Sequence, residues 1–178
     1  VRLDESDHDV SAALGAAALA LILAGCSHPP QPAPASSRLS PTTMVEAIRA
    51  AGAVDKSVVQ VMPLRDPSVD GYLDGARADE GAGKYRDALD KLNAALKLSP
   101  DAPDILQFRA EIEILLKDDA AAEADARRSY ELGAKVGGLC ASNWETVLEI
   151  AESKNDRAGV QSARSAREAC HKAGPIRM

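Results

Sequence analysis

Side chains that could support catalysis are few in this chain and lie far apart in its sequence. The three histidines are His8, His28 and His171. No Ser-His-Asp or Cys-His set can be assembled within the part that we expect to fold, and the sequence contains no HExxH or CxxC motif. We therefore expect that the chain is not an enzyme and that it carries no cofactor.

Two further clusters of chemically active residues have simple structural explanations. The run Gly81–Lys84 is similar to a phosphate-binding loop, but Ala78 and Tyr85 stand where that loop has Gly and Ser or Thr. We interpret the run as the turn between two helices. The carboxylates at positions 70, 74, 79 and 80 do not have the spacing of a calcium loop. We interpret them as a solvated helix face and expect no metal site.

Cys26 follows an apolar, uncharged segment at positions 10–25, which is shorter than the ~20 residues of a membrane-spanning helix. Such a segment is typical of the apolar part of a signal peptide. Its end, Leu23-Ala24-Gly25-Cys26, resembles the bacterial lipobox. The resemblance implies a signal peptide at 1–25, cleavage after Gly25 and acylation of Cys26, with palmitate among the acyl groups. Positions 1–9 are acidic where signal peptides are basic, and a buried helix with an ordinary cysteine is the alternative.

Residues 26–41 are rich in Pro and Ser, so they cannot bury apolar surface and favour extended conformations. We expect a disordered tether behind the lipid. Ser27 stands where inner-membrane lipoproteins of enteric bacteria have Asp. By that resemblance, the expected location is the outer membrane, on its periplasmic face.

Helical periodicity dominates the rest of the chain. Residues 42–66 form an expected N-terminal extension with a short helix at Thr43–Ala51, and Val58–Leu64 is a β-branched patch of unclear state. From residue 67 to 178 apolar residues recur at helical spacing, beginning with Val69, Tyr72, Leu73 and Ala76. Successive stripes are separated by short turns, so we expect helical hairpins.

The segment from Val69 to Pro100 resembles a tetratricopeptide-repeat (TPR) unit, which has about 34 residues. The residues that carry the resemblance are small, aromatic or helix-stopping: Ala76, Gly83, Tyr85, Ala88, Ala95 and Pro100. A second, weaker unit begins at Pro103, with Ala110 and Ala122 34 positions after Ala76 and Ala88. The resemblance implies an all-α fold, a short TPR-like array of two to three helical hairpins.

The third hairpin follows an insertion of about three residues. Trp144, Val147, Leu148 and Ala151 form its first apolar stripe, and Asp156 is the expected cap of its second helix. An unrelated bundle of three hairpins is the alternative for the whole domain.

In TPR domains the first helix of each unit lines a concave surface that binds partners. Carried over residue by residue, the resemblance assigns partner binding to Asp70, Leu73, Arg77 and Glu80, and to Asp104, Gln107, Glu111 and Ile114. In the third hairpin, helical spacing puts Glu145, Glu149 and Glu152 together. Such a groove is acidic and favours a basic peptide or protein segment. A charged face that only keeps the domain soluble is the alternative.

The formal net charge of -6 excludes a nucleic-acid partner, which would require clustered Lys and Arg. We therefore expect a membrane-anchored, periplasmic protein-interaction module, a scaffold or adaptor of the cell envelope. The alternative is an envelope enzyme or an accessory factor that acts on peptidoglycan. A deep pocket with converging carboxylates would favour the enzyme.

Three cysteines occur in the chain, and lipidation of Cys26 would leave an even pair in an oxidising compartment. Cys140 lies just before the first helix of the third hairpin, and Cys170 ends the helix that returns. The two ends of an antiparallel hairpin meet, within the ~4.4–6.8 Å between Cα atoms that a disulfide requires. We predict a Cys140–Cys170 disulfide. Two buried free thiols are the alternative, and a zinc site with His171 lacks further ligands.

Overall fold

The structure is a computed structural model that describes residues 40–54 and 65–171. This part of the chain is all-α, as expected, and it contains no β-strand. In chain order its helices are α1 (Pro41–Val54), α2 (Pro67–Gly81), α3 (Tyr85–Leu98), α4 (Pro103–Leu115), α5 (Asp119–Leu132), α6 (Gly138–Ser153) and α7 (Arg157–Ala169). The predicted signal segment, Cys26, the tether up to residue 39 and positions 58–64 lie outside the described residues.

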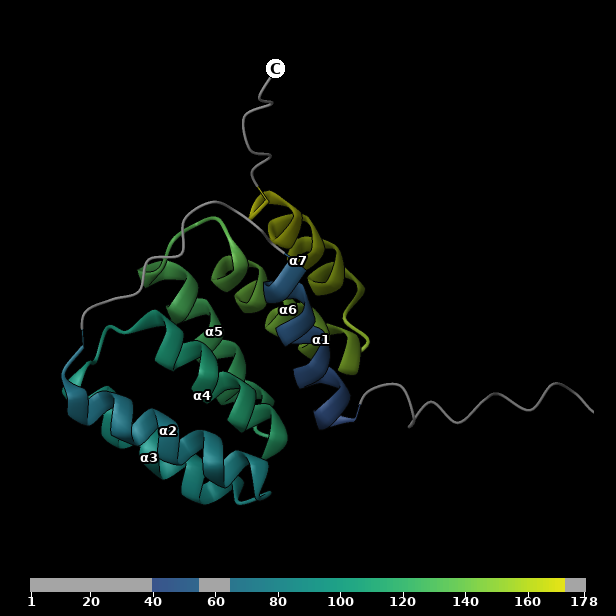
Figure 1. Cartoon of the computed structure of the whole chain (residues 1–178). Helices are drawn as coiled ribbons and strands as arrows, with labels where there is room; N and C mark the ends of the chain where they lie inside the picture. The colour runs from purple at the N-terminus through teal and green to yellow at the C-terminus, as the bar shows by residue number, and fades with distance from the viewer. Residues whose placement is uncertain (1–39, 55–64, 172–178) are drawn as a thin grey trace, which may run out of the picture. The chain divides into compact units, whose positions relative to one another are not determined.

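Helices α2 to α7 form three successive hairpins with the same turn (Figure 1). Each first helix ends at a residue with positive φ: Gly83 at 72°, Lys117 at 64° and Asn155 at 56°. In each turn the next N–H bonds back to the carbonyl five positions earlier, over 2.8–2.9 Å. This is a Schellman-type helix end, which satisfies carbonyls that the helix leaves without a donor. Gly81–Lys84 is therefore a hairpin turn, as interpreted.

The spacing of these turns gives the length of each repeat in residues. Gly83 and Lys117 are 34 positions apart, which is the length expected of a TPR unit. Lys117 and Asn155 are 38 apart, so the insertion before the third hairpin is four residues, close to the three expected.

Aspartate side chains begin three of these helices. Asp66 accepts a hydrogen bond from the Ser68 N–H at 2.8 Å, Asp118 from Ala121 at 3.2 Å, and Asp156 from Gly159 at 3.0 Å. These bonds satisfy N–H groups that the first helical turn leaves free. Asp156 is the cap that the sequence predicts.

Small residues allow the hairpins to pack closely. Ala76, Ala88, Ala95, Ala110 and Ala122 are fully buried. The second helix of each hairpin packs against the first helix of the next, α3 on α4 and α5 on α6. Helix α4 therefore lies between neighbours on two sides, which explains its two apolar faces. Its buried apolar residues are Ile105, Leu106, Ala110, Ile112 and Ile114.

Helix α1 joins the array out of sequence order, because it packs against α6 and α4. Met44, Val45 and Ile48 enter a core cluster that also contains Ile114 and Val147. Gly52 and Gly138 let the two backbones approach, since a Cβ at Gly138 would lie 2.5 Å from the Gly52 carbonyl oxygen. Helix α1, which lies within the predicted N-terminal extension, therefore packs as part of the helical array. Within the described ranges, no helix is both long and apolar enough to cross a bilayer.

Candidate functional site

A cavity of about 410 Å³ opens where α1, α2, α4 and the start of α6 meet. This volume is within the ~300–1,000 Å³ range of ligand pockets. Polar and charged side chains dominate its wall. The lining residues are Arg49 of α1, Leu73, Arg77 and Glu80 of α2, Asp104, Gln107, Phe108 and Glu111 of α4, and Leu139 and Ser142 of α6.

Most of the partner-binding residues predicted on the first two hairpins meet at this cavity. They are Leu73, Arg77, Glu80, Asp104, Gln107 and Glu111. Their convergence follows from the 34-residue spacing, which gives α2 and α4 equivalent faces. Asp70 is exposed one turn before Leu73 and is not a lining residue. Ile114 is buried in the core cluster with α1, so α1 covers that part of the expected groove.

The three glutamates predicted on α6 lie against α7 and do not line this cavity. Glu145 is buried and pairs with Arg167, and Glu152 pairs with Arg164 at 3.4 Å. The expectation that they form one groove with the residues of α2 and α4 is therefore wrong. The physical reason is that Arg164 and Arg167 of α7 pair with Glu152 and Glu145, so this face of α6 packs against its own hairpin partner.

Burial and mutual repulsion act on the pKa values of this second acidic group. The pKa of Glu149 is raised to about 7 by burial and by the charges of Glu145 and Glu152, against the opposing effect of Arg167. A second carboxyl, Glu113 of α4, has its pKa raised to about 8 by burial and by Asp125, although Arg109 lowers it. Neither residue lines the cavity.

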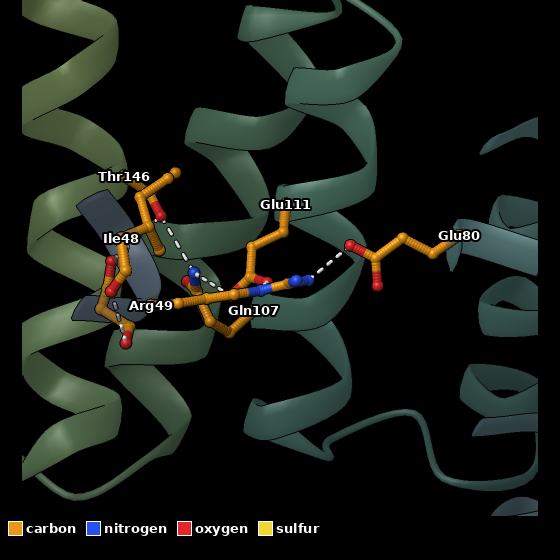
Figure 2. Close-up of polar contacts among 7 residues, drawn as sticks. Ile48, Arg49, Glu80, Gln107, Glu111 and Thr146 are labelled. Atoms are coloured by element: carbon orange, nitrogen blue, oxygen red, sulfur yellow. Dashed lines mark hydrogen bonds and ion pairs between the residues drawn. The ribbon is translucent and has the colours of Figure 1, made fainter. Parts of the chain in front are cut away.

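Arg49 links three helices at the cavity, as Figure 2 shows. Its Nε donates to Glu111 and its terminal nitrogen to Glu80, each at 2.7 Å. The Gln107 amide nitrogen donates to Thr146 of α6 at 3.0 Å and to Glu111 at 3.4 Å. Arg49 is not among the residues predicted from the sequence. The only available signal was a lone arginine within the predicted helix at Thr43–Ala51.

Glu111 is the most deeply placed charge of the cavity. Burial raises its pKa, and the Arg49 guanidinium and the Gln107 amide act in the opposite direction. Arg49 is half-exposed whereas Glu111 is almost covered, so the guanidinium lies between this carboxylate and solvent.

Most of the carboxylates at positions 70, 74, 79 and 80 pair with basic side chains. Asp74 pairs with Arg77, Asp79 with Lys91 and Glu80 with Arg49. Among the described residues, no group of three or more His, Cys, Asp or Glu side chains could hold a metal ion.

The predicted disulfide joins Cys140 and Cys170, whose Cα atoms are 5.6 Å apart. It connects the start of α6 to the end of α7, and the Gly137 N–H donates to the Cys170 carbonyl at 3.0 Å beside it. Tyr130 and Trp144 pack against the buried cluster of Cys140, Ala141 and Cys170, with their ring centroids 5.0 Å apart. The pairing inferred from the cysteine count is thus present in the structure.

No protein-family model and no curated protein matches this chain. A comparison with solved structures does find a neighbour, whose description is the globular C-terminal domain of P. aeruginosa LpoP. The chain is similar to this LpoP domain. The sequence identity is 28%, the TM-score is 0.55, and the match covers 59% of this chain and 99% of the LpoP chain.

Nearly the whole LpoP domain is covered by the match, although the match covers little more than half of this chain. That unit is described as the C-terminal domain of LpoP, and the first helix among the residues described here is α1 at Pro41–Val54.

Proposed function

We propose that this chain is a non-catalytic protein-interaction module of the bacterial envelope, which binds a protein or peptide at the cavity between α1, α2 and α4. The observation that carries the proposal is the convergence of Arg77, Glu80, Asp104, Gln107 and Glu111 on that cavity. Equivalent faces of successive repeats supply these residues, which is how helical arrays build extended binding surfaces. The likeness to a domain of LpoP, a protein of a Gram-negative bacterium, supports the same assignment.

We further propose that Cys26 carries a lipid that holds the module at the outer membrane, on the periplasmic side. The lipobox resemblance at Leu23–Cys26 and the Pro- and Ser-rich stretch after it support this location. The disulfide also fits, because such bonds persist in oxidising compartments. In this arrangement the lipid determines location, the tether provides reach, and the helical array provides recognition.

An envelope enzyme or a factor acting on peptidoglycan is the competing function. Three carboxylates do converge on the cavity, as such an enzyme would need. Each of them is paired with an arginine: Glu80 and Glu111 with Arg49, and Asp104 with Arg65. A general acid must hold a proton near neutral pH. Burial raises the pKa of Glu111, but its two oxygens are already bound to Arg49 and Gln107, so this arrangement suits recognition better than proton transfer to a substrate.

Site-specific photocrosslinking in living cells tests the proposed function. A photoreactive amino acid replaces Arg77, an exposed residue of the cavity wall, and Leu139 provides a second position. Arg128 on α5 is the matched control, since it is also an exposed arginine that pairs with one carboxylate. We expect a discrete crosslinked protein from the two cavity positions and none from Arg128. The same yield at all three positions would contradict a binding role for the cavity.

A further inference from the structure

Two arginines from different helices line the cavity, Arg49 of α1 and Arg77 of α2. Arg49 bridges Glu80 of α2 and Glu111 of α4. The Arg77 guanidinium lies over the Phe108 ring of α4, 5.9 Å from its centroid. Arg77 precedes Glu80 by three positions and Phe108 precedes Glu111 by three, a spacing of about 5–6 Å between Cβ atoms on a helix. Both guanidiniums therefore lie between α2 and α4, about one helical turn apart.

The most exposed charges of the cavity wall are positive. The side chains of Arg49 and Arg77 are 48% and 61% exposed. Those of Glu80 and Glu111, which both pair with Arg49, are only 16% and 10% exposed. The third carboxylate of the wall, Asp104, is 40% exposed and already pairs with an arginine. A group that enters the cavity therefore meets guanidinium N–H groups before it meets the glutamate oxygens.

Both guanidiniums also have hydrogen-bond donors that are not in use. A guanidinium can donate from each of its three nitrogens. Arg49 donates from Nε and one terminal nitrogen, and Arg77 donates from one terminal nitrogen. The second terminal nitrogen of each side chain has no hydrogen bond within the described ranges. Glu111, by contrast, accepts at both of its oxygens. The unused hydrogen-bonding capacity at the cavity is therefore mainly that of donors.

The ion pair of Arg77 is easily exchanged. Its partner Asp74 lies three positions earlier on α2, at 3.0 Å, and its side chain is 80% exposed. Asp74 is not a lining residue of the cavity. Exposed pairs of this kind contribute little free energy, because water and salt screen them. Arg77 can therefore exchange Asp74 for a carboxylate that enters the cavity.

Resting on the proposed function, we propose that the cavity binds an acidic side chain of the partner, whose carboxylate accepts hydrogen bonds from Arg49 and Arg77 together. Hydrogen bonds between a guanidinium and a carboxylate are charge-assisted and stronger than those between neutral groups. A lysine or arginine of the partner would meet the two guanidiniums first and would be repelled by them. The prediction of a basic partner counted carboxylates that the structure places against Arg49 or against α7.

The order of the charges in space, and not their sum, produces this preference. Arg49 and Arg77 together balance Glu80 and Glu111, so the four groups have no net charge when all are ionised. The two cations are the exposed members of this set and the two anions are the covered ones. Because charge interactions weaken with distance, a carboxylate in contact with the arginines gains more than it loses to the glutamates behind them.

Three labelled peptides test the inference on the purified full chain with its disulfide intact. They are short alanine-based helices that differ only at two positions one turn apart, which hold glutamate, glutamine or lysine. Fluorescence anisotropy measures their affinities. We expect the glutamate peptide to bind about ten-fold more tightly than the glutamine peptide, since charge-assisted hydrogen bonds replace neutral ones. The lysine peptide should bind most weakly.

Two pairs of variants locate the site. Arg77→Gln should remove most of the preference for glutamate, whereas Arg128→Gln, an exposed arginine of α5 that also pairs with one carboxylate, should leave it unchanged. Asp74→Asn should tighten binding of the glutamate peptide several-fold, because Arg77 loses its competing partner. Asp70→Asn is the control for the loss of one negative charge, since Asp70 is an exposed residue of α2 that does not line the cavity.

Three outcomes would overturn the inference: equal binding of the glutamate and glutamine peptides, preference for the lysine peptide, or equal gains from Asp74→Asn and Asp70→Asn. A failed inference remains distinguishable from a failed function, because a photoreactive group at Leu139 leaves both arginines in place. If that group captures a partner protein while none of the peptides binds, the inference is wrong and the module binds through other chemistry. If the glutamate peptide binds as expected but no protein is captured, the cavity has the proposed preference and the proposed function is wrong.

Discussion

At the scale of single residues, one arginine organises the charges of the candidate site. Arg49 lies between the nearly buried Glu111 and solvent, and it also joins α1 to α2 through Glu80. Repeat position predicts the carboxylates of the site. It does not predict the arginine that pairs with them, because α1 is outside the repeats. The chemistry of the site therefore depends on a residue that no repeat pattern indicates.

A single residue, Glu149, should make the stability of the folded chain depend on pH. Its pKa is raised from 4.5 to about 7 in the folded chain by burial and by Glu145 and Glu152. The folded state thus binds the Glu149 proton more tightly than the unfolded state. The stability gained from this proton is fully present below about pH 4.5 and is lost as the pH rises to about 7. Glu149→Gln should raise the free energy of unfolding at pH 8 by about 1 kcal/mol, after allowance for solvent screening of a half-buried group.

Urea unfolding followed by circular dichroism at pH 5 and at pH 8 measures this effect. The gain from Glu149→Gln should be much smaller at pH 5. An equal gain at both pH values would show that the carboxyl does not titrate in this range. Charge reversal at Glu145 and Glu152 is a poor test of binding, because it would break their pairs with α7.

At the scale of elements, the contact between α1 and α6 depends on two glycines. Gly138→Ala would place a Cβ 2.5 Å from the Gly52 carbonyl oxygen, a backbone atom that cannot move aside cheaply. We expect it to lower the free energy of unfolding by about 1–3 kcal/mol through overpacking. Gly71→Ala in α2 is the control, since no atom lies within 4 Å of the added methyl group. That substitution should instead stabilise by about 0.5–1 kcal/mol, because alanine favours the helix.

Thermal melts of both variants check the prediction. If Gly138→Ala were as stable as Gly71→Ala, α1 would not pack against α6 as closely as the structure shows. If Gly138→Ala destabilises the chain, the contacts of Arg49 should also be lost, because Arg49 lies on the same helix, α1.

The stability of the terminal hairpin, α6 and α7, should depend on its disulfide. Helix α7 buries only Ala163 within its own span, together with Cys170 directly after it. The bond closes a loop with a sequence separation of 30, which in the chain-entropy estimate stabilises the native state by roughly 3.5 kcal/mol. A Cys140→Ser/Cys170→Ser variant should therefore be less stable by about 2–4 kcal/mol.

Hydrogen exchange locates the effect of the cysteine substitutions. Amides of α7 should lose protection first, while those of α2 and α3, which belong to a separate core cluster, should keep it. Uniform loss of protection along the chain would mean that the disulfide stabilises the domain as a whole. Two free thiols in the folded, oxidised protein would contradict the pairing itself.

At the scale of the whole molecule, the proposed anchor is tested at Cys26. Cys26→Ser should abolish labelling by a fatty-acid analogue and release the protein from the membrane fraction, because the thiol is the expected site of lipid attachment. Ser27→Ala is the control and should leave labelling intact. If neither the original chain nor the variant is labelled, Cys26 is not a lipidation site, and the proposed location would have to be abandoned without affecting the helical domain.

Much of this molecule follows from local sequence. Helix positions follow from apolar periodicity, and their ends from Gly83, Pro100 and the capping aspartates, because these signals act within one or two helical turns. The 34-residue spacing then places the residues of α2 and α4 on equivalent faces, so six of the cavity residues were predictable. The Cys140–Cys170 pair was predictable too, since the ends of one hairpin meet.

The position of α1 on the faces of α4 and α6 is determined only by the tertiary structure. Helix α1 packs on α4 and α6, far along the chain, and no local signal specifies the partner of a short amphipathic helix. Its position buries Ile114 and brings Arg49 to Glu80 and Glu111. The pairing of Glu145 and Glu152 with arginines of α7 is likewise a tertiary contact. The physical reason is that burial of apolar surface is non-directional. It requires Met44, Val45 and Ile48 to be covered, but the shape of the assembled hairpins determines where.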